Sequence, residues 1–304
     1  MKRRRFLAIT AAAGALAAGP ARAFRLDPVE WRGVALGAPA TLIIHHEDRD
    51  EALRLVRACE AEIARQEAIF SLYRPDSALV RLNRDGALEA PPLDLVTLLA
   101  LAGRMWELSE GTFDPTVQPL WDVYARHFGQ PGASPDGPDA ESLAAAKDRL
   151  GWPHVSLAAD RVALARPGMA LTLNGIAQGW ITDRVADLLR RAGMRHVLVD
   201  MGEIRALGRR GDGMPWTVED ETSHRRLDLQ SGAMATSSPD GTRFSPCCHH
   251  LFDPATGRSA AAARAVTVLA DEAAVADGLA TAIAIHPTAG AALCRSLGAR
   301  TITA

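Results

Sequence analysis

The feature that most limits the fold is a change in hydrophobic pattern near Trp152. Before it, apolar residues recur at helical spacing, most clearly over 49–70, where Leu55, Cys59 and Ile63 share one face. After it, short runs of β-forming residues alternate with turn residues. This order predicts an α+β fold with mixed, largely antiparallel sheets packed with helices. We expect the helices and the strands to pack on one another, so 24–304 is predicted to be a single domain.

The individual elements follow from the same patterns. Helices are predicted at 49–70, 95–110, 139–150, 175–192 and 271–285, with another opening at Pro287. Strands are predicted at 34–46, 155–158, 162–165, 169–173, 197–200, 204–207, 216–219, 226–229, 233–237 and 265–269. Asp94 and Asp271 are predicted helix caps, and the Pro/Gly-rich stretch 129–138 is predicted to be a surface loop.

The first 23 residues are typical of a signal peptide. A basic cluster precedes an apolar run from Phe6 to Ala18, and Ala21-Arg22-Ala23 resembles a cleavage site. The run is shorter than the roughly 20 residues that span a bilayer. Arg3-Arg4-Arg5-Phe6-Leu7 fits the twin-arginine export signal, with a general secretory signal as the alternative. The residue directly after the cleavage site is Phe24 and not a cysteine that could carry a lipid anchor. We therefore expect a soluble periplasmic protein with no direct membrane anchor.

Charge and cysteine content argue against nucleic-acid binding and against a disulfide scaffold. The formal net charge is −2 and the isoelectric point about 6.5, which gives no basic footprint for nucleic acid. The four cysteines are too few for a disulfide scaffold, and their pairing stays open: Cys59, Cys247, Cys248 and Cys294. The run 247–250, Cys-Cys-His-His, suggests zinc, but adjacent residues do not easily converge on one ion and the usual zinc spacings are missing.

Asp277 and Thr281 lie four residues apart in the predicted helix 271–285, and therefore on one face. A carboxylate and a hydroxyl that point the same way suit a hard cation such as Mg²⁺, which prefers oxygen ligands. On spacing alone, an Asp and a Thr one turn apart more often form a local hydrogen bond or face solvent.

Three other segments combine polar groups with restrained backbone. Residues 171–180 run from a strand through a glycine turn into a helix, whose first N–H groups could hold phosphate; a plain tight turn is the alternative. The segment 111–120, with Asp114 between two threonines, could be a binding loop or only a helix C-cap and a turn. His250 stands near a strand end, where it could act as acid or base or simply bond to its neighbours.

Seven segments in chain order resemble the FAD:protein FMN transferase family, the ApbE-like flavin transferases. The resemblance runs over about 34–284, most of the chain. The segments are 71–83, 111–120, 174–183, 200–204, 235–237, 250–257 and 276–281. The resemblance implies an ApbE-like, T-fold-related architecture. It also implies Mg²⁺-dependent transfer of FMN from FAD to a Thr or Ser hydroxyl of an acceptor flavoprotein, with release of AMP.

The same resemblance implies roles for individual residues. Asp277, Thr281 and the backbone carbonyl near Gly175 would hold the metal, and His250 would act in catalysis. The FAD contacts would come from several loops. They are Leu36, Tyr73, Thr112, Phe113, Asp114, Thr172, Gln178 and Leu251.

The chain also departs from the family pattern. Thr172 stands where the family usually has an Asp, and Gln178 where it often has a charged residue. Glu203 follows Gly202 directly, and Ser238 is followed by Pro239. These departures indicate a subgroup, similar to variants associated with nitrous oxide reductase maturation, whose acceptor is a membrane-bound flavoprotein. Two alternatives stay open: an FAD pyrophosphatase that gives FMN and AMP, and a non-catalytic flavin-binding maturation factor.

Overall fold

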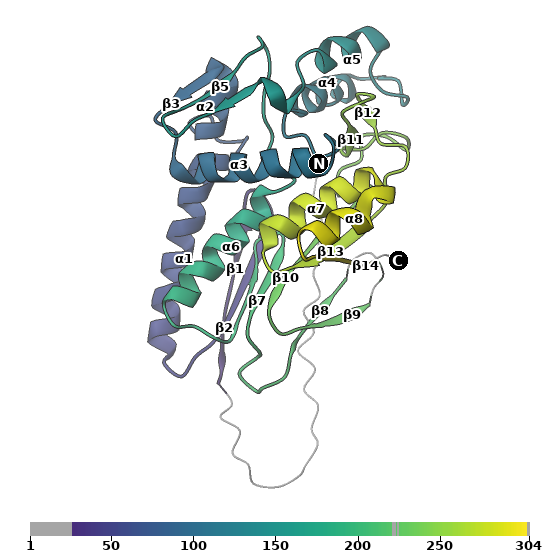
Figure 1. Cartoon of the computed structure of the whole chain (residues 1–304). Helices are drawn as coiled ribbons and strands as arrows, with labels where there is room; N and C mark the ends of the chain where they lie inside the picture. The colour runs from purple at the N-terminus through teal and green to yellow at the C-terminus, as the bar shows by residue number, and fades with distance from the viewer. Residues whose placement is uncertain (1–25, 221–222, 224, 303–304) are drawn as a thin grey trace.

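The computed structural model describes residues 26–220, 223 and 225–302, and its centre is a seven-stranded sheet (Figure 1). The order along the sheet is β1-β2-β6-β7-β10-β13-β14, and every neighbouring pair is antiparallel. The strands are β1 Pro28–Ala35, β2 Ala38–His45, β6 Val197–Asp200, β7 Ile204–Leu207, β10 Gly232–Ser237, β13 Val266–Ala270 and β14 Arg300–Ile302. The sheet therefore joins the beginning of the described chain to its end.

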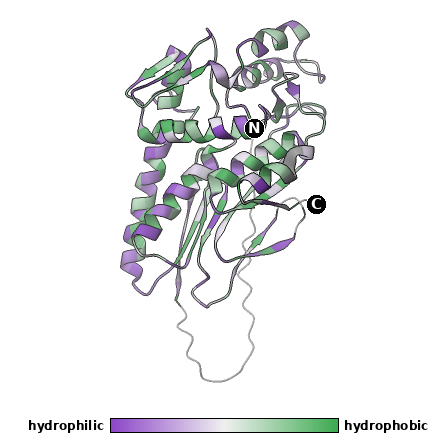
Figure 2. Ribbon diagram, in the orientation of Figure 1, coloured by the Kyte–Doolittle hydropathy of each residue, from purple (hydrophilic) through white to green (hydrophobic). Residues whose placement is uncertain are grey.

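Helices cover one face of this sheet. They are α1 (Arg49–Phe70), α6 (Ala177–Arg191) and α7 (Ala273–Ile285), with α8 (Gly290–Ser296) beside α7. Side chains alternate along β2, so that Leu42 and Ile44 join the core under the helices while Ile43 faces the other side. Figure 2 shows that α7 is hydrophobic along most of its length, and nearly all of its side chains are buried.

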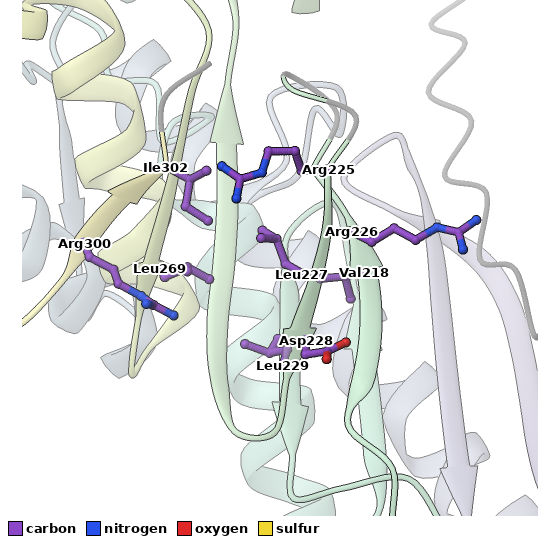
Figure 3. A pocket seen from close by; sticks show the side chains of 9 residues that line it. All are labelled: Val218, Arg225, Arg226, Leu227, Asp228, Leu229, Leu269, Arg300 and Ile302. Atoms are coloured by element: carbon purple, nitrogen blue, oxygen red, sulfur yellow. The ribbon is translucent and has the colours of Figure 1, made fainter.

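A small hairpin covers part of the opposite face. Its strands are β8 (Trp216–Glu219) and β9 (Arg226–Leu229), and Trp216 packs with Ile43 in a second apolar cluster. A cavity of about 560 Å³ opens between this hairpin and the last two strands of the sheet (Figure 3). Apolar side chains and three arginines, Arg225, Arg226 and Arg300, line the cavity. None of its lining residues is a predicted site residue.

A third region lies above the helices in Figure 1. Its helices are α2 (Ala78–Asp85), α3 (Leu93–Leu108), α4 (Gln118–Phe128) and α5 (Ala140–Lys147). Its strands are β3 (Ala87–Glu89), β4 (Val155–Leu157), β5 (Arg161–Leu164), β11 (Phe252–Asp253) and β12 (Arg258–Ser259). Short 3₁₀ turns occur at Trp152–His154, Pro239–Gly241 and Pro287–Ala289. Buried Tyr124 of α4 is surrounded by Leu120, Leu143 and Phe252 in an apolar cluster separate from the main core.

The predicted α+β class is confirmed, and so are most of its elements. Helix α1 has the predicted bounds, and β6, β7, β8 and β9 coincide with the predicted strands. The predicted hairpin forms as β4 and β5. The helices predicted around 95–110, 139–150, 175–192 and 271–285 are present but shorter or shifted at their ends.

Two predicted strands are wrong. The stretch 34–46 is broken by a turn at Leu36 and Gly37, whose φ angles of 47° and 79° suit a tight hairpin turn. The stretch 169–173 has no regular secondary structure and joins no sheet, because the Asn83 side chain bonds both the N–H and the carbonyl of Leu171. A side-chain amide here occupies the backbone groups that a neighbouring strand would otherwise bond.

The predicted caps also differ, and two helices are unexpected. Helix α3 begins after Pro92, and Asp94 instead accepts hydrogen bonds from Arg65 and Gln66 of α1. Helix α7 begins after Glu272 rather than at Asp271, and neither caps it with its side chain. Helices α2 and α4 were not predicted, because each is short and enclosed by turn residues.

The predicted signal peptide lies outside the described residues. Among the residues that are described, none of the helices has both the length and the apolar character needed to cross a membrane.

Candidate functional site

Helix α7 carries Asp277 and Thr281 toward the start of α6. The Thr281 hydroxyl lies 3.4 Å from the carbonyl oxygen of Gly175 and 3.2 Å from the hydroxyl of Ser237 at the end of β10. A Cβ added at Gly175 would come within 2.9 Å of the Thr281 hydroxyl oxygen, so only glycine permits this approach. The structure therefore brings the predicted ligands Gly175 and Thr281 into contact, and Asp277 lies one turn before Thr281 on the same helix.

Asp277 is 4% exposed and caps α6. Its Oδ2 accepts a hydrogen bond from the Gly179 N–H at 3.1 Å. Gly179 lies in the first turn of α6, where N–H groups lack a partner within the helix. The helix start predicted to hold phosphate therefore gives at least this one donor to a carboxylate of the protein, and a negative charge there is favourable.

Helix α6 caps α7 in return. Both carboxylate oxygens of buried Asp183 accept hydrogen bonds, from Ala273 N–H and Ala274 N–H, each at 2.9 Å. Arg205 of β7 forms an ion pair with the same carboxylate. Burial raises the pKa of Asp183, and the Arg205 charge opposes that shift. Each helix thus supplies the carboxylate that caps the other, which fixes Asp277 relative to α6.

The two helices can cross this closely because α6 has glycine at the contact. A Cβ added at Gly179 would lie 2.3 Å from the carbonyl oxygen of Ala273 and 2.7 Å from the nitrogen of Ala274. Both atoms belong to backbone, which cannot move aside as a side chain can. Gly179 therefore sets the separation between α6 and α7.

The segment before α6 runs beside the loop after α3. Thr172 N–H bonds to the Pro115 carbonyl at 2.8 Å. The Phe113 ring is 4% exposed, and a Cβ at Gly175 would lie 3.4 Å from it. Phe113 therefore packs close to Gly175, and its contact with FAD stays a prediction. Thr112, at the same turn, is only partly buried.

Asp114 turns inward to hold its own loop. Its Oδ1 accepts bonds from the Thr116 N–H at 2.8 Å and from the Thr116 hydroxyl at 2.6 Å. The Thr116 hydroxyl oxygen in turn accepts the Gly151 N–H at 2.7 Å. Burial raises the pKa of the Asp114 carboxyl, and the bonds from Thr116 partly offset this. The Asp114 carboxylate therefore has its partners within its own loop, and its contact with FAD stays a prediction.

Gln178 lies over the turn that follows β6. A Cβ at Gly202 would meet the Gln178 side-chain nitrogen at 2.4 Å, and Gly202 has φ of 102°, a conformation that favours glycine. Glu203, which departs from the family pattern, is buried, and its carboxylate accepts the Thr236 N–H at 3.1 Å. The glutamate thus joins the turn after β6 to β10.

His250 and its neighbour His249 have different hydrogen-bond partners. The Nδ1 of His250 lies 3.2 Å from the Thr242 carbonyl oxygen. A carbonyl only accepts, so Nδ1 carries the proton and Nε2 is the basic nitrogen of the neutral ring. His249 is 8% exposed, and its Nδ1 accepts the Leu251 N–H at 3.3 Å. Burial lowers the pKa of His249. Leu251 itself is buried.

Leu36 and Tyr73 lie at another part of the sheet, near the end of α1. The Leu36 N–H bonds to Glu67 of α1 at 2.9 Å, and the Tyr73 N–H bonds to Ser71 just after that helix. Tyr73 is 69% exposed, which leaves its ring open to a ligand. Leu36 and Tyr73 are therefore held beside the end of α1, whereas Gly175 and Thr281 meet at the α6–α7 junction and His250 bonds to Thr242.

Sequence reasoning assigned no role to three residues that organise this site. Asn83 holds the segment before α6, Asp183 caps α7, and Ser237 contacts Thr281. All three fall in segments that carry the family resemblance, and that was the available signal. Within the described chain, no group of three or more His, Cys, Asp or Glu side chains could hold a metal.

Known proteins are similar to this chain over most of its length. The model of the ApbE family matches residues 36–302. An FAD:protein FMN transferase of Vibrio cholerae is 34% identical over 235 residues, covering 71% of this chain and 68% of the relative. An FAD:protein FMN transferase of Klebsiella pneumoniae is 29% identical over 277 residues, covering 84% of this chain and 75% of the relative.

Solved structures are similar as well. The flavinyl transferase ApbE of Pseudomonas stutzeri superposes with a TM-score of 0.77 and 29% identity, over 91% of each chain. A histidine-to-glycine variant of the flavin transferase ApbE of Vibrio cholerae gives a TM-score of 0.78 and 27% identity, over 90% of this chain and 92% of the variant.

Proposed function

The chain belongs to the ApbE family, and we propose from this that it transfers FMN from FAD to a threonine or serine hydroxyl of an acceptor flavoprotein, with release of AMP. The observation that carries the proposal is the contact of the Thr281 hydroxyl with the Gly175 carbonyl, one helical turn after Asp277, which caps α6. Relatives named FAD:protein FMN transferase match most of the chain and support this interpretation.

The donor set at the α6–α7 junction fits magnesium. A buried carboxylate, a hydroxyl and a backbone carbonyl are all oxygen ligands, which a hard cation prefers. The glycine that lets the carbonyl approach the hydroxyl is required for this set. Magnesium bound there by Asp277, Thr281 and Gly175 would neutralise charge on the FAD pyrophosphate as AMP leaves.

The protein's own groups would do the remaining work. His250 would accept the proton of the acceptor hydroxyl at Nε2, because Nδ1 is committed to the Thr242 carbonyl. The hairpin that carries His250 follows Ser237, which touches Thr281, so the base and the metal ligands are linked by a short segment. Tyr73, exposed at the end of α1, could cover the flavin ring.

One experiment tests the proposal. We expect the chain from residue 24 to quench FAD fluorescence at micromolar protein with excess Mg²⁺. With a flavoprotein encoded beside it as acceptor, AMP should appear in step with a fluorescent acceptor band on a denaturing gel. AMP and free FMN at the same rate without acceptor would favour the pyrophosphatase instead. Quenching of FAD fluorescence without release of AMP or FMN would favour a non-catalytic flavin-binding factor. No quenching would contradict all three hypotheses, because each of them requires FAD binding.

Export to the periplasm is the second part of the proposal, supported by Arg3-Arg4 ahead of a modest apolar run. Replacing Arg3 and Arg4 by lysine should stop export, because the twin-arginine receptor reads the arginine pair while the charge is conserved. Cell fractionation and immunoblotting measure the result. An unchanged periplasmic yield would assign the chain to the general secretory route.

The membrane flavoprotein of nitrous oxide reductase maturation is the acceptor we would try first in the transfer assay.

A further inference from the structure

Residues 242–250 form a hairpin whose tip carries two adjacent cysteines. At its base the Thr242 carbonyl accepts the His250 N–H at 3.1 Å. Arg243 and His249 form the next bridge, and the Phe244 N–H bonds to the Cys248 carbonyl at 2.9 Å. The cysteines are therefore separated from His250 by the few hydrogen bonds of one hairpin.

The tip of this hairpin is docked on the loop 129–138 through a single carbonyl. The Pro135 oxygen lies 2.7 Å from Ser245 Oγ, 3.0 Å from Cys247 Sγ and 3.8 Å from Cys248 Sγ. Both sulfur atoms thus converge on one oxygen. Cys247 is exposed, whereas Cys248 is 3% exposed and packs in the cluster around Tyr124.

This arrangement gives the two thiols unequal access. An oxidant in solution can reach Cys247, while Cys248 is placed behind it, close enough to attack a sulfur bonded to Cys247. The other two cysteines, Cys59 and Cys294, are buried in the main core. Burial raises the pKa of the Cys59 thiol to about 12 and also raises the pKa of the Cys248 thiol, so exposed Cys247 is the thiol that reacts first with an oxidant, and Cys248 can react only with the adjacent Cys247 sulfur.

We propose that Cys247 and Cys248 are a reversible oxidation site that forms a vicinal disulfide by exchange with a disulfide oxidant and thereby loosens the hairpin at His250. The Cys247 thiolate attacks the oxidant, breaking its S–S bond and releasing one oxidant thiol. Cys248 then attacks Cys247 Sγ and releases the second. The S–H bonds of Cys247 and Cys248 and the S–S bond of the oxidant are broken. The S–S bond between the two cysteines and the S–H bonds of two oxidant thiols are formed, so two electrons and two protons pass to the oxidant.

The new ring changes the peptide between the cysteines. The Cys248 N–H bonds to the Ser245 carbonyl at 3.3 Å and lies 3.1 Å from Ser245 Oγ. Adjacent Cα atoms are about 3.8 Å apart, below the roughly 4.4–6.8 Å of ordinary disulfides. Closing the ring must therefore turn this peptide and withdraw the sulfurs from Pro135. Such strained disulfides are readily reduced, which makes the change reversible.

The test uses the whole chain and glutathione disulfide as the probe. Trypsin releases 244–258 as one peptide that holds Cys247 and Cys248 and neither of the other cysteines. We expect this peptide to lose the mass of two hydrogens and to regain it with dithiothreitol, while the peptides with Cys59 and Cys294 stay unchanged. Hydrogen exchange at the His250 amide should become about tenfold faster, the worth of one hydrogen bond.

The Cys247→Ser variant is the matched control, because an exposed hydroxyl replaces an exposed thiol. It should form no disulfide and show no change in exchange with oxidant. Three results would overturn the proposal. They are glutathione that stays bonded to Cys247, no oxidation of either cysteine, and a disulfide that forms without changing hydrogen exchange at the His250 amide. These readings need no enzyme activity, so they are decided separately from the proposed transfer reaction. If that reaction is observed, oxidation should slow it in the parent and not in Cys247→Ser.

Discussion

Replacing Asp277 by alanine is expected to lower the rate of FMN transfer by about 10²–10³-fold, the usual effect of removing one electrostatic contact to developing charge. Asp277 is the charged member of the oxygen donor set, and its loss removes the main attraction for magnesium. Transfer is measured as AMP release and as flavin fluorescence of the acceptor across a magnesium series. FAD binding should persist, because predicted FAD contacts such as Tyr73 lie on other elements.

The structure adds a second effect, because Asp277 also caps α6 through the Gly179 N–H. Alanine should therefore cost about 1 kcal/mol of unfolding free energy as well. Asp277→Asn separates the two effects, since its amide oxygen can still accept the hydrogen bond but carries no charge. Thr281→Ala should cost less activity, because water can replace a neutral hydroxyl. Wild-type transfer by Asp277→Asn at limiting magnesium would show that the carboxylate acts only as a cap.

Replacing Gly179 by alanine is expected to lower the free energy of unfolding by about 1–3 kcal/mol, the typical cost of overpacking. The new methyl group would press on the backbone of Ala273 and Ala274, which can yield only if α6 and α7 move apart. This cost acts against the gain of up to about 1 kcal/mol that alanine brings to a helix. Chemical denaturation followed by circular dichroism measures the difference.

Gly278→Ala is the matched control, on α7 in the same helix pair. A Cβ there would meet the side chains of Met105 at 3.2 Å and Ile176 at 3.4 Å. These side chains can adjust, so this variant should be near wild type or slightly more stable. Equal denaturation midpoints for the two variants would mean that the helix separation does not depend on Gly179. Greater transfer loss in Gly179→Ala than in Gly278→Ala would tie that separation to the site.

The sequence predicted elements well where local pattern decides them. Helix α1 has regular apolar spacing and an Asp48 cap, and its bounds were predicted as they are. Prediction from the sequence failed where a residue far away in the chain forms the hydrogen bonds of a segment's backbone. The segment 169–173 looked like a strand, but Asn83, 88 residues away, takes the Leu171 bonds. Asp271 looked like a cap, but Asp183 occupies that place.

The site was predicted from family resemblance more than from chemistry visible in the chain. The pair Asp277 and Thr281 follows from helical spacing, since both lie on one helix. Gly175 and Ser237 come to this pair from other elements, and no local pattern marks that meeting. The inward turn of Asp114 and the burial of Phe113 were equally invisible, because both depend on packing across the region above the sheet.

The reciprocal caps also bear on the order of folding. The bond from Ala273 to Asp183 joins residues 90 apart in the chain, and the bond from Gly179 to Asp277 joins residues 98 apart. Bringing such distant residues together costs loop entropy that only the intervening strands can offset. The capped junction should therefore form late in folding, after β6, β7, β10 and β13 have aligned. The proposed metal ligands would then be ordered only in molecules whose sheet is complete, so a partly folded chain would not present them.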